Sequence, residues 1–159
     1  MKETAADAVK LEGREEILES IQRILSAGIP VMGYLRLTPQ SIHKFETYAI
    51  RAKSEAKKLV HDAYILEEAG CFAIVIEKVL TALAARVAKE ISIPIISIGA
   101  DGDVDRQVLV IHNILGINQE FSPRFLHRYH NLFAEMTGTV SNYIADVKSG
   151  DFPNEREQY

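Results

Sequence analysis

Three charged residues stand where an α/β protein would carry a catalytic or binding group. Glu77 directly follows the apolar run Cys71–Ile76, while Lys10 and Glu12 close a short strand-like stretch early in the chain. A carboxylate at a strand end can act as a general base or as an oxygen ligand of a divalent cation. The residue types alone leave open the ordinary alternative, in which these charges are exposed to solvent at a strand end and a turn.

The elements that must position these residues follow from two alternating hydrophobic patterns. Apolar residues recurring at steps of three and four predict helices, and short continuous apolar runs predict buried strands. The predicted strands cover residues 8–11, 29–35, 71–76, 93–98 and 108–111, and the predicted helices cover residues 14–27, 54–69, 82–90 and 124–148, with a long connection over residues 37–53. Ser54 is expected to cap the second helix, and the last helix is expected to break near Thr137 and Gly138. Apolar strands alternating with helices indicate an α/β fold with a parallel sheet.

The carboxyl ends of parallel strands are the usual place for chemistry in such folds. Here those ends fall at Lys10–Glu12, Gly33–Leu35, Glu77–Lys78, Ser97–Asp101 and His112–Asn113. If the strands curl around a common axis, their polar groups converge on one mouth. The sequence therefore predicts a single site at this end of the sheet.

The composition is that of a soluble globular domain. The 159 residues carry 18 Lys and Arg against 22 Asp and Glu, and 47% of them are hydrophobic. The net charge of −4 argues against a nucleic-acid-binding protein, and no apolar run approaches the roughly 20 residues that span a membrane. The single cysteine, Cys71, predicts a buried core thiol and a cytoplasmic protein. We expect one domain over residues 1–148 and a polar tail over residues 149–159.

A series of motifs at these strand ends is similar to one enzyme family. The motifs are Lys10–Gly13, Ile29–Ser41, Leu66–Gly70, Val75–Glu77, Ile93–Ala100, Val108–His112 and Leu115–Ile117. In this order and at this spacing they resemble ketopantoate hydroxymethyltransferase, also called 3-methyl-2-oxobutanoate hydroxymethyltransferase. The resemblance covers almost the whole chain.

The resemblance implies a fold, a reaction and cofactors. The family has a (β/α)8 TIM-barrel fold and transfers a hydroxymethyl group from 5,10-methylenetetrahydrofolate to 3-methyl-2-oxobutanoate. The product is 2-dehydropantoate, a precursor of pantothenate. The implied cofactors are Mg²⁺ and 5,10-methylenetetrahydrofolate, and the implied partner is the 2-oxoacid substrate.

The same resemblance assigns roles to three residues. Lys10 matches a lysine that binds the 2-oxoacid, and Glu12 matches an acidic residue of the Mg²⁺ site. Glu77 matches the general base that takes a proton from the carbon next to the substrate carbonyl.

Four positions depart from the family pattern near this mouth. Tyr34 stands where the family has histidine, and Arg36 stands where it has glycine. The family's Gly-Ile-Gly-Ala-Gly reads here as Ser97-Ile98-Gly99-Ala100-Asp101, which alters positions 97 and 101. Because glycine lets a ligand or a backbone approach closely, these changes predict an altered site.

The chain length limits how much of the family fold is expected. A complete (β/α)8 barrel needs at least about 200 residues. We therefore expect the C-terminal portion only: an open half-barrel of about five parallel strands that lacks the family's two Mg²⁺-binding aspartates. Such a half-barrel exposes two sheet edges and an apolar inner face, which predicts self-association or pairing with a complementing barrel half.

Two functional hypotheses follow. In the first, the chain is a hydroxymethyltransferase that is inactive in isolation and works when another chain supplies the missing aspartates. In the second, it is a non-catalytic, degenerate paralogue or fragment that associates with a full-length enzyme or with itself.

Overall fold

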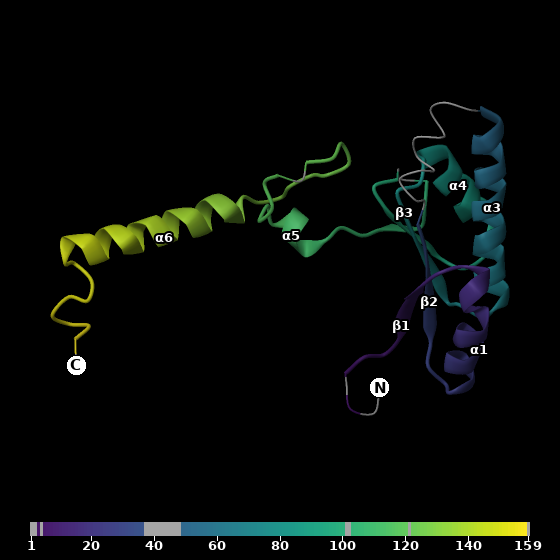
Figure 1. Cartoon of the computed structure of the whole chain (residues 1–159), viewed down its shortest axis with the longest axis horizontal. Coiled ribbons are helices and arrows are strands. Elements are labelled where there is room, and N and C mark those ends of the chain that lie inside the picture. The colour runs from purple at the N-terminus through teal and green to yellow at the C-terminus, as the bar shows by residue number, and fades with distance from the viewer. Residues whose placement is uncertain (1–2, 4, 37–48, 101–102, 121, 159) are drawn as a thin grey trace. The chain divides into compact units, whose positions relative to one another are not determined.

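The computed structural model describes residues 3, 5–36, 49–100, 103–120 and 122–158 (Figure 1). The chain divides into two compact units, Met1–Val108 and Leu109–Tyr159, and each is described by itself. Among the described residues, none of the helices is both long and apolar enough to cross a membrane.

The first unit is built on a five-stranded parallel sheet. Its elements are β1 (Val9–Glu12), the 3-10 helix η1 (Glu15–Ile17), α1 (Leu18–Ser26), β2 (Val31–Arg36), α3 (Ala49–Glu68), β3 (Ala73–Glu77), α4 (Thr81–Glu90), β4 (Ile95–Ile98) and β5 (Arg106–Gln107). The strands pair in chain order from β1 to β5, and all four pairings are parallel. This open sheet with intervening helices confirms the predicted α/β class and is the arrangement of part of a (β/α)8 barrel.

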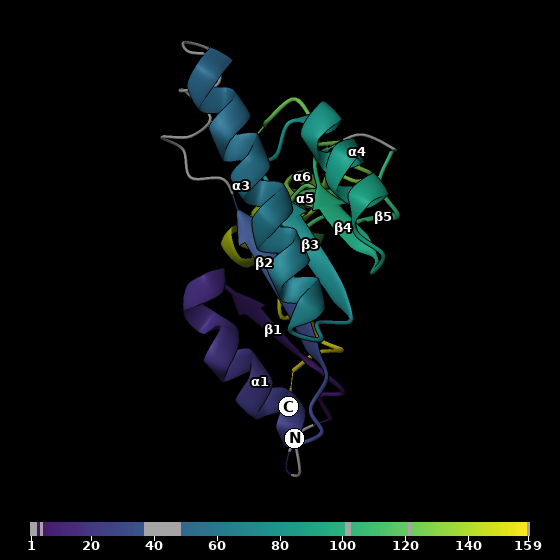
Figure 2. The same cartoon turned by 90° about the vertical axis from the view of Figure 1, so that its right-hand side faces the viewer.

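The described helices α1, α3 and α4 lie on one side of this sheet (Figure 2). In Figure 2, α1, α3 and α4 lie in front of the strands, and Figure 1 shows the same layer from its edge. The core lies between the two layers, where Leu35, Ile74 and Ile76 of the sheet meet Leu59 and Leu66 of α3. Burying such side chains contributes about 1.5–3 kcal/mol each.

Cys71 belongs to the same core. Its side chain is 2% exposed, and burial raises the pKa of its thiol because the thiolate would lose its hydration. The prediction of a buried core thiol is therefore confirmed.

Two predicted boundaries are wrong, one within the first unit and one where the chain passes from the first unit to the second. Ser54 lies inside α3, which begins at Ala49, so it is not the cap of that helix. Val108–Ile111 does not form the fifth strand: β5 is Arg106–Gln107, and Ile111 starts the short helix α5 (Ile111–Ile114). The apolar run turns because Val110 accepts backbone hydrogen bonds from Asn113 and Ile114, at 2.9 and 3.0 Å, which begin a helix instead of extending a ladder.

The second unit consists of α5, a connecting segment and α6 (Leu132–Ser149). The predicted helix over residues 124–148 starts later, because the Asn131 side chain caps α6 by accepting from Ala134 N at 3.2 Å. The predicted break near Thr137 and Gly138 is absent, and α6 continues through both positions.

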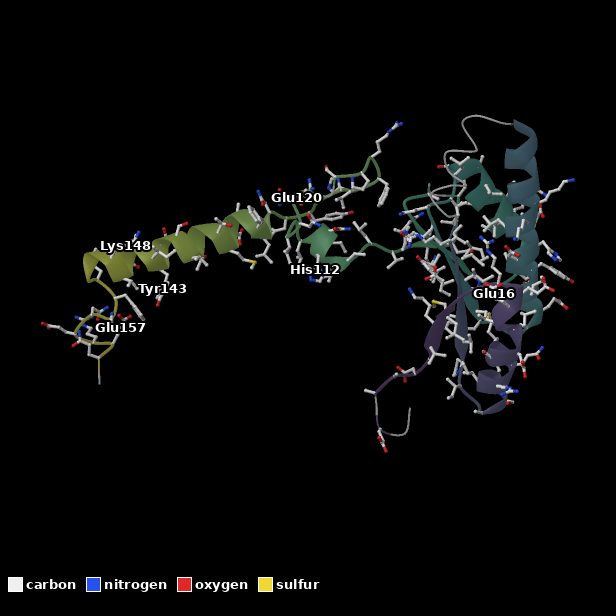
Figure 3. All side chains as sticks on the ribbon, in the orientation of Figure 1. Glu16, His112, Glu120, Tyr143, Lys148 and Glu157 are labelled. Atoms are coloured by element: carbon white, nitrogen blue, oxygen red, sulfur yellow. The ribbon has the colours of Figure 1, made fainter. Side chains whose placement is uncertain are left out.

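Gly150, in the left-handed conformation with φ 81°, ends α6. Beyond it, the Phe152 ring meets the Tyr143 ring edge-on, with ring centroids 5.5 Å apart. Tyr143 lies on α6 (Figure 3). The boundary expected after residue 148 stays a prediction.

Candidate functional site

The carboxyl ends of β1, β2 and β3 bring the charged residues to one side of the sheet. Neighbouring residues of a strand point to opposite faces, and paired residues of parallel strands share a face. The register pairs Glu12 with Tyr34 and Arg36 with Glu77. Leu35 and Ile76, which alternate with them, face the helices. Tyr34, Arg36 and Glu77 therefore lie on the side of the sheet away from its helices.

Glu77 is held by two residues of β2. The Tyr34 hydroxyl donates a hydrogen bond to Oε2 of Glu77, and Arg36 Nε lies 3.9 Å from the same oxygen. The Glu77 side chain remains 23% exposed, so it is partly open to solvent. Neighbouring strands thus present a carboxylate with one phenol and one guanidinium beside it.

Lys10 reaches the same cluster from β1. Its Nζ lies 4.6 Å from the centroid of the Tyr34 ring, which is within the range of a cation–π interaction. The aromatic face attracts the ammonium, while the hydroxyl of the same side chain bonds Glu77. Tyr34 is therefore the residue that joins the predicted oxoacid-binding lysine to the predicted base.

The Tyr34 phenol stays protonated at any physiological pH. Burial, followed by the hydrogen bond and charge of Glu77, raises the pKa of Tyr34 to about 12. Only 8% of the residue is exposed, so a phenolate would lose most of its hydration beside a carboxylate. Tyr34 thus acts as a permanent hydrogen-bond donor.

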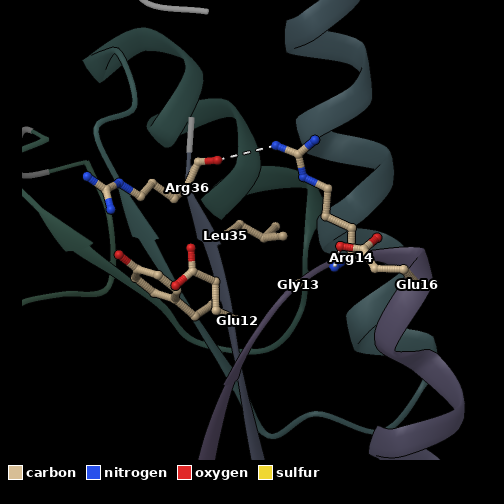
Figure 4. Close-up of a pocket in the computed structure, with 7 residues that line it drawn as sticks. Glu12, Gly13, Arg14, Glu16, Leu35 and Arg36 are labelled. Carbon is tan, nitrogen blue, oxygen red and sulfur yellow. Dashed lines mark hydrogen bonds between the residues drawn. The ribbon is translucent and has the colours of Figure 1, made fainter. Parts of the chain in front are cut away.

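A cavity of about 240 Å³ opens beside this cluster (Figure 4). Its lining residues come from the end of β1, the following turn and the end of β2: Glu12, Gly13, Arg14, Glu16, Tyr34, Leu35 and Arg36. Arg14 closes one side by donating from Nη2 to the backbone carbonyl of Arg36 at 3.2 Å. Of the site positions predicted from sequence, the cavity is lined by Glu12, Tyr34 and Arg36.

Arg14 is a residue that sequence reasoning missed. It lies immediately after the Lys10–Gly13 motif, and its Nε is 3.1 Å from Oδ2 of Asp62 on α3. The two residues are far apart in the chain and neither belongs to a motif. The signal that could have singled out Asp62 is its place on the apolar face of α3, where a charge needs a partner.

Two of the altered family positions lie away from this cluster or outside the described residues. Ser97 is 1% exposed, pairs with Ile76 and therefore shares the face toward the helices. Its Oγ accepts a hydrogen bond from Ala100 N at 3.1 Å, which ties the end of β4 to the next turn. Asp101 lies outside the described residues.

The described residues do not fit a complete Mg²⁺ site. Glu12 offers one carboxylate at the end of β1, and in the described part of the chain no three His, Cys, Asp or Glu side chains cluster as metal ligands would. Mg²⁺ prefers octahedral oxygen coordination, commonly with one or two carboxylates, waters and substrate oxygens. Glu12 alone is one such ligand.

Comparison with known proteins identifies relatives along nearly the whole chain. Residues 1–155 match the family model of ketopantoate hydroxymethyltransferase. The chain is 66% identical to the 3-methyl-2-oxobutanoate hydroxymethyltransferase of Parabacteroides distasonis, 64% to that of Flavobacterium johnsoniae and 62% to that of Bacteroides fragilis. Each alignment covers 100% of this chain and 59% of the relative, so the chain spans about three fifths of the length of these proteins.

Proposed function

The chain belongs to the ketopantoate hydroxymethyltransferase family, and we propose that it carries part of the site that transfers a hydroxymethyl group from 5,10-methylenetetrahydrofolate to 3-methyl-2-oxobutanoate. The observation that carries this proposal is the juxtaposition of Lys10, Tyr34 and Glu77 at the carboxyl ends of three adjacent strands. Lys10 and Glu77 are the positions that match the family's oxoacid-binding lysine and general base.

The proposed chemistry begins with a proton transfer to Glu77. The carboxylate takes the proton from C3 of the 2-oxoacid, and the electron pair of that C–H bond forms the C2–C3 double bond of an enolate. C3 is then the nucleophile that would form the new C–C bond to the one-carbon unit. Water would supply the hydroxyl oxygen, and tetrahydrofolate would leave with the proton from Glu77 and the second proton from that water. Lys10, as an ammonium, pairs with the anionic oxoacid and opposes the charge that develops on it.

In this proposal, Glu12 is the described residue that would bind Mg²⁺. When bound, the ion would polarise the oxoacid carbonyl and favour the enolate. Glu12 is the described residue that would contribute an oxygen, and the remaining ligands would have to come from outside the described residues. The proton transfer itself is assigned to Glu77.

Hydrogen–deuterium exchange at C3 of 3-methyl-2-oxobutanoate tests the proposed base. The substrate is incubated in D₂O with the native protein purified from its source, and loss of the C3 proton signal is followed by NMR. Glu77→Gln should slow exchange by about 100-fold or more, because it removes the proton acceptor. The matched control is Glu68→Gln, an exposed glutamate on α3, which should leave the rate unchanged. Exchange that persists in Glu77→Gln would exclude this base.

A non-catalytic function is the second candidate, and one observation favours it. Tyr34 and Arg36, which replace the family's histidine and glycine, both engage Glu77. Both side chains lie against the Glu77 carboxylate, on the side from which a substrate carbon would have to approach. If this candidate is right, the protein co-purifies with a full-length relative and shows no C3 exchange alone; exchange by the purified protein would exclude it.

We further propose that the side of the sheet opposite α1, α3 and α4 is covered in the working protein, by a second copy or by a complementing barrel half. Its support is the partial exposure of Met32, Ile96 and Ile98 on that side, together with the edge positions of β1 and β5. Apolar faces and open edges favour association. Light scattering of the native protein should give a mass above that of one chain, and a monomer in dilute buffer would overturn the proposal.

The single cysteine supports a cytoplasmic location.

A further inference from the structure

Tyr34 contacts two groups of the proposed site through different parts of one side chain. From β2 it presents its ring face to Lys10 of β1, with Nζ 4.6 Å from the ring centroid. Its hydroxyl donates to Oε2 of Glu77 on β3. The side chain therefore lies between the two, and its rigid ring fixes the separation of the contacts it makes.

We propose that Tyr34 is a positioning residue of this site, whose ring holds the Lys10 ammonium and whose hydroxyl holds the Glu77 carboxylate at a fixed separation. The inference rests on the proposed function for the roles of Lys10 and Glu77. It goes beyond that function in giving a part to a residue that replaces the family's histidine.

The contact with Glu77 orients the carboxylate without occupying both of its oxygens. Tyr34 and Arg36 both lie against Oε2. The proposal assigns acceptance of the substrate proton to the other carboxylate oxygen, Oε1. An orientation fixed in this way matters because small misplacements of a reacting group are costly.

Burial, and after it the charged groups that face Tyr34, keep the hydroxyl of this residue protonated. Glu77 and Glu12 raise the pKa of the phenol, while Arg36 opposes them, and Lys10 lies over the ring. The first and largest cause of the raised pKa is burial of the phenol. The hydroxyl therefore remains a donor across the range in which an enzyme works.

Two variants separate the hydroxyl from the ring. Tyr34→Phe keeps the ring under Lys10 and removes the donor, so kcat for C3 exchange should fall about tenfold while KM for the oxoacid changes less than about twofold. Tyr34→Leu removes both, so KM should also rise by about fivefold as Lys10 loses its aromatic partner. Tyr34→His supplies a donor again and should recover part of the kcat lost in Tyr34→Phe. Equal KM changes in the Phe and Leu variants, or an unchanged kcat in Tyr34→Phe, would overturn the proposal.

A titration that needs no activity distinguishes this inference from the proposed reaction. The ¹³Cζ resonance of Tyr34, assigned from its loss in Tyr34→Phe, should titrate with a midpoint near the pKa of about 12 expected for this phenol. Glu77→Gln should move the midpoint toward the ordinary value of 10. The control is Glu12→Gln, which removes a nearby charge without a hydrogen bond and should move it less.

The titration and the exchange assay can fail independently. A midpoint that Glu77→Gln does not move overturns the positioning contact, whatever the exchange rate. A midpoint that moves as expected, in a protein that shows no C3 exchange, supports the Tyr34 contact and overturns the proposed reaction.

Discussion

Nε of Arg14 lies 3.1 Å from Oδ2 of Asp62, a residue only 3% exposed within α3. The same guanidinium donates from Nη2 to the backbone carbonyl of Arg36. Arg14 thus links the turn after β1 both to a helix of the covering layer and to the end of β2. This link supports the strand ends that carry Glu12 and Tyr34.

Removing Arg14 should destabilise the fold. Arg14→Met leaves the Asp62 carboxylate buried without its partner, and breaking such a pair costs about 2–3 kcal/mol where one partner is partly exposed. The free energy of unfolding, measured in urea, gives the change. Arg23→Met is the matched control, because the Arg23–Glu19 pair lies on the exposed face of α1 and should contribute less than about 0.5 kcal/mol. Equal losses in the two variants would contradict a structural role for the Asp62 pair.

Asp62 should also give the fold a pH dependence of definite sign. Burial raises the pKa of its carboxyl above the usual 3.8, and Arg14 opposes this shift only in part. The unfolded chain loses the Asp62 proton near pH 3.8, and the folded chain loses it at a higher pH. The free energy of unfolding that Asp62 contributes is therefore fully present below pH 3.8 and is lost as the pH rises through the raised pKa of the folded state. Asp62→Asn cannot ionise, so the stability of the wild type relative to this variant should fall across that window. A relative stability that rises with pH there would show that the Arg14 charge outweighs burial.

The strands and the common edge of the site could be predicted from sequence, because both follow from local pattern. The apolar run before Glu77 forms β3, and the strand-end rule brings Lys10 and Glu12 to the same end of the sheet. The contact between Tyr34 and Glu77 depends on register, which a single sequence does not fix.

Other features depend on how local and long-range interactions compete, which the pattern of residue types does not reveal. Val108–Ile111 is as apolar as the true strands, and Val108 N still bonds the Ser97 carbonyl of β4. The Val110 carbonyl, however, accepts from Asn113 and Ile114 and so begins α5. Gly138 is a weak helix former, but the residues on both sides of it carry α6 through that position. The partnership of Arg14 with Asp62 joins distant parts of the chain and has no local signature.

Gly33 should not tolerate a side chain, because β2 packs closely on α3 there. A Cβ at this position would lie 2.8 Å from Cδ1 of Leu66, which is fully buried and has little room to move. Gly33→Ala should therefore lower the free energy of unfolding by about 1–3 kcal/mol. In a double-mutant cycle, Leu66→Ala should offset part of this loss, and strict additivity would contradict a clash between the two residues.

A matched methyl group in α6 should have the opposite effect. At Gly138 no described atom outside the neighbouring backbone of α6 lies within 4 Å of an added Cβ, and the residue lies inside the helix. Gly138→Ala should stabilise α6 by about 0.5–1 kcal/mol, because alanine has the higher helix propensity. Amide hydrogen exchange across α6 measures this gain, and faster exchange in the variant would contradict it.

Lys78, which directly follows Glu77, has a backbone conformation that favours glycine. Its φ is 57°, whereas a side chain makes the left-handed region costly by roughly 1–2 kcal/mol. Lys78→Gly should relieve this cost. Because glycine has more conformational freedom in the unfolded chain, part of the gain is offset, and the free energy of unfolding should rise by up to about 1 kcal/mol. Lys78→Val, whose branched side chain fits this region worst, should instead lose about 1–2 kcal/mol. Thermal unfolding of the pair decides the matter: a glycine variant that melts below the wild type would contradict strain at the residue that ends the Glu77 strand.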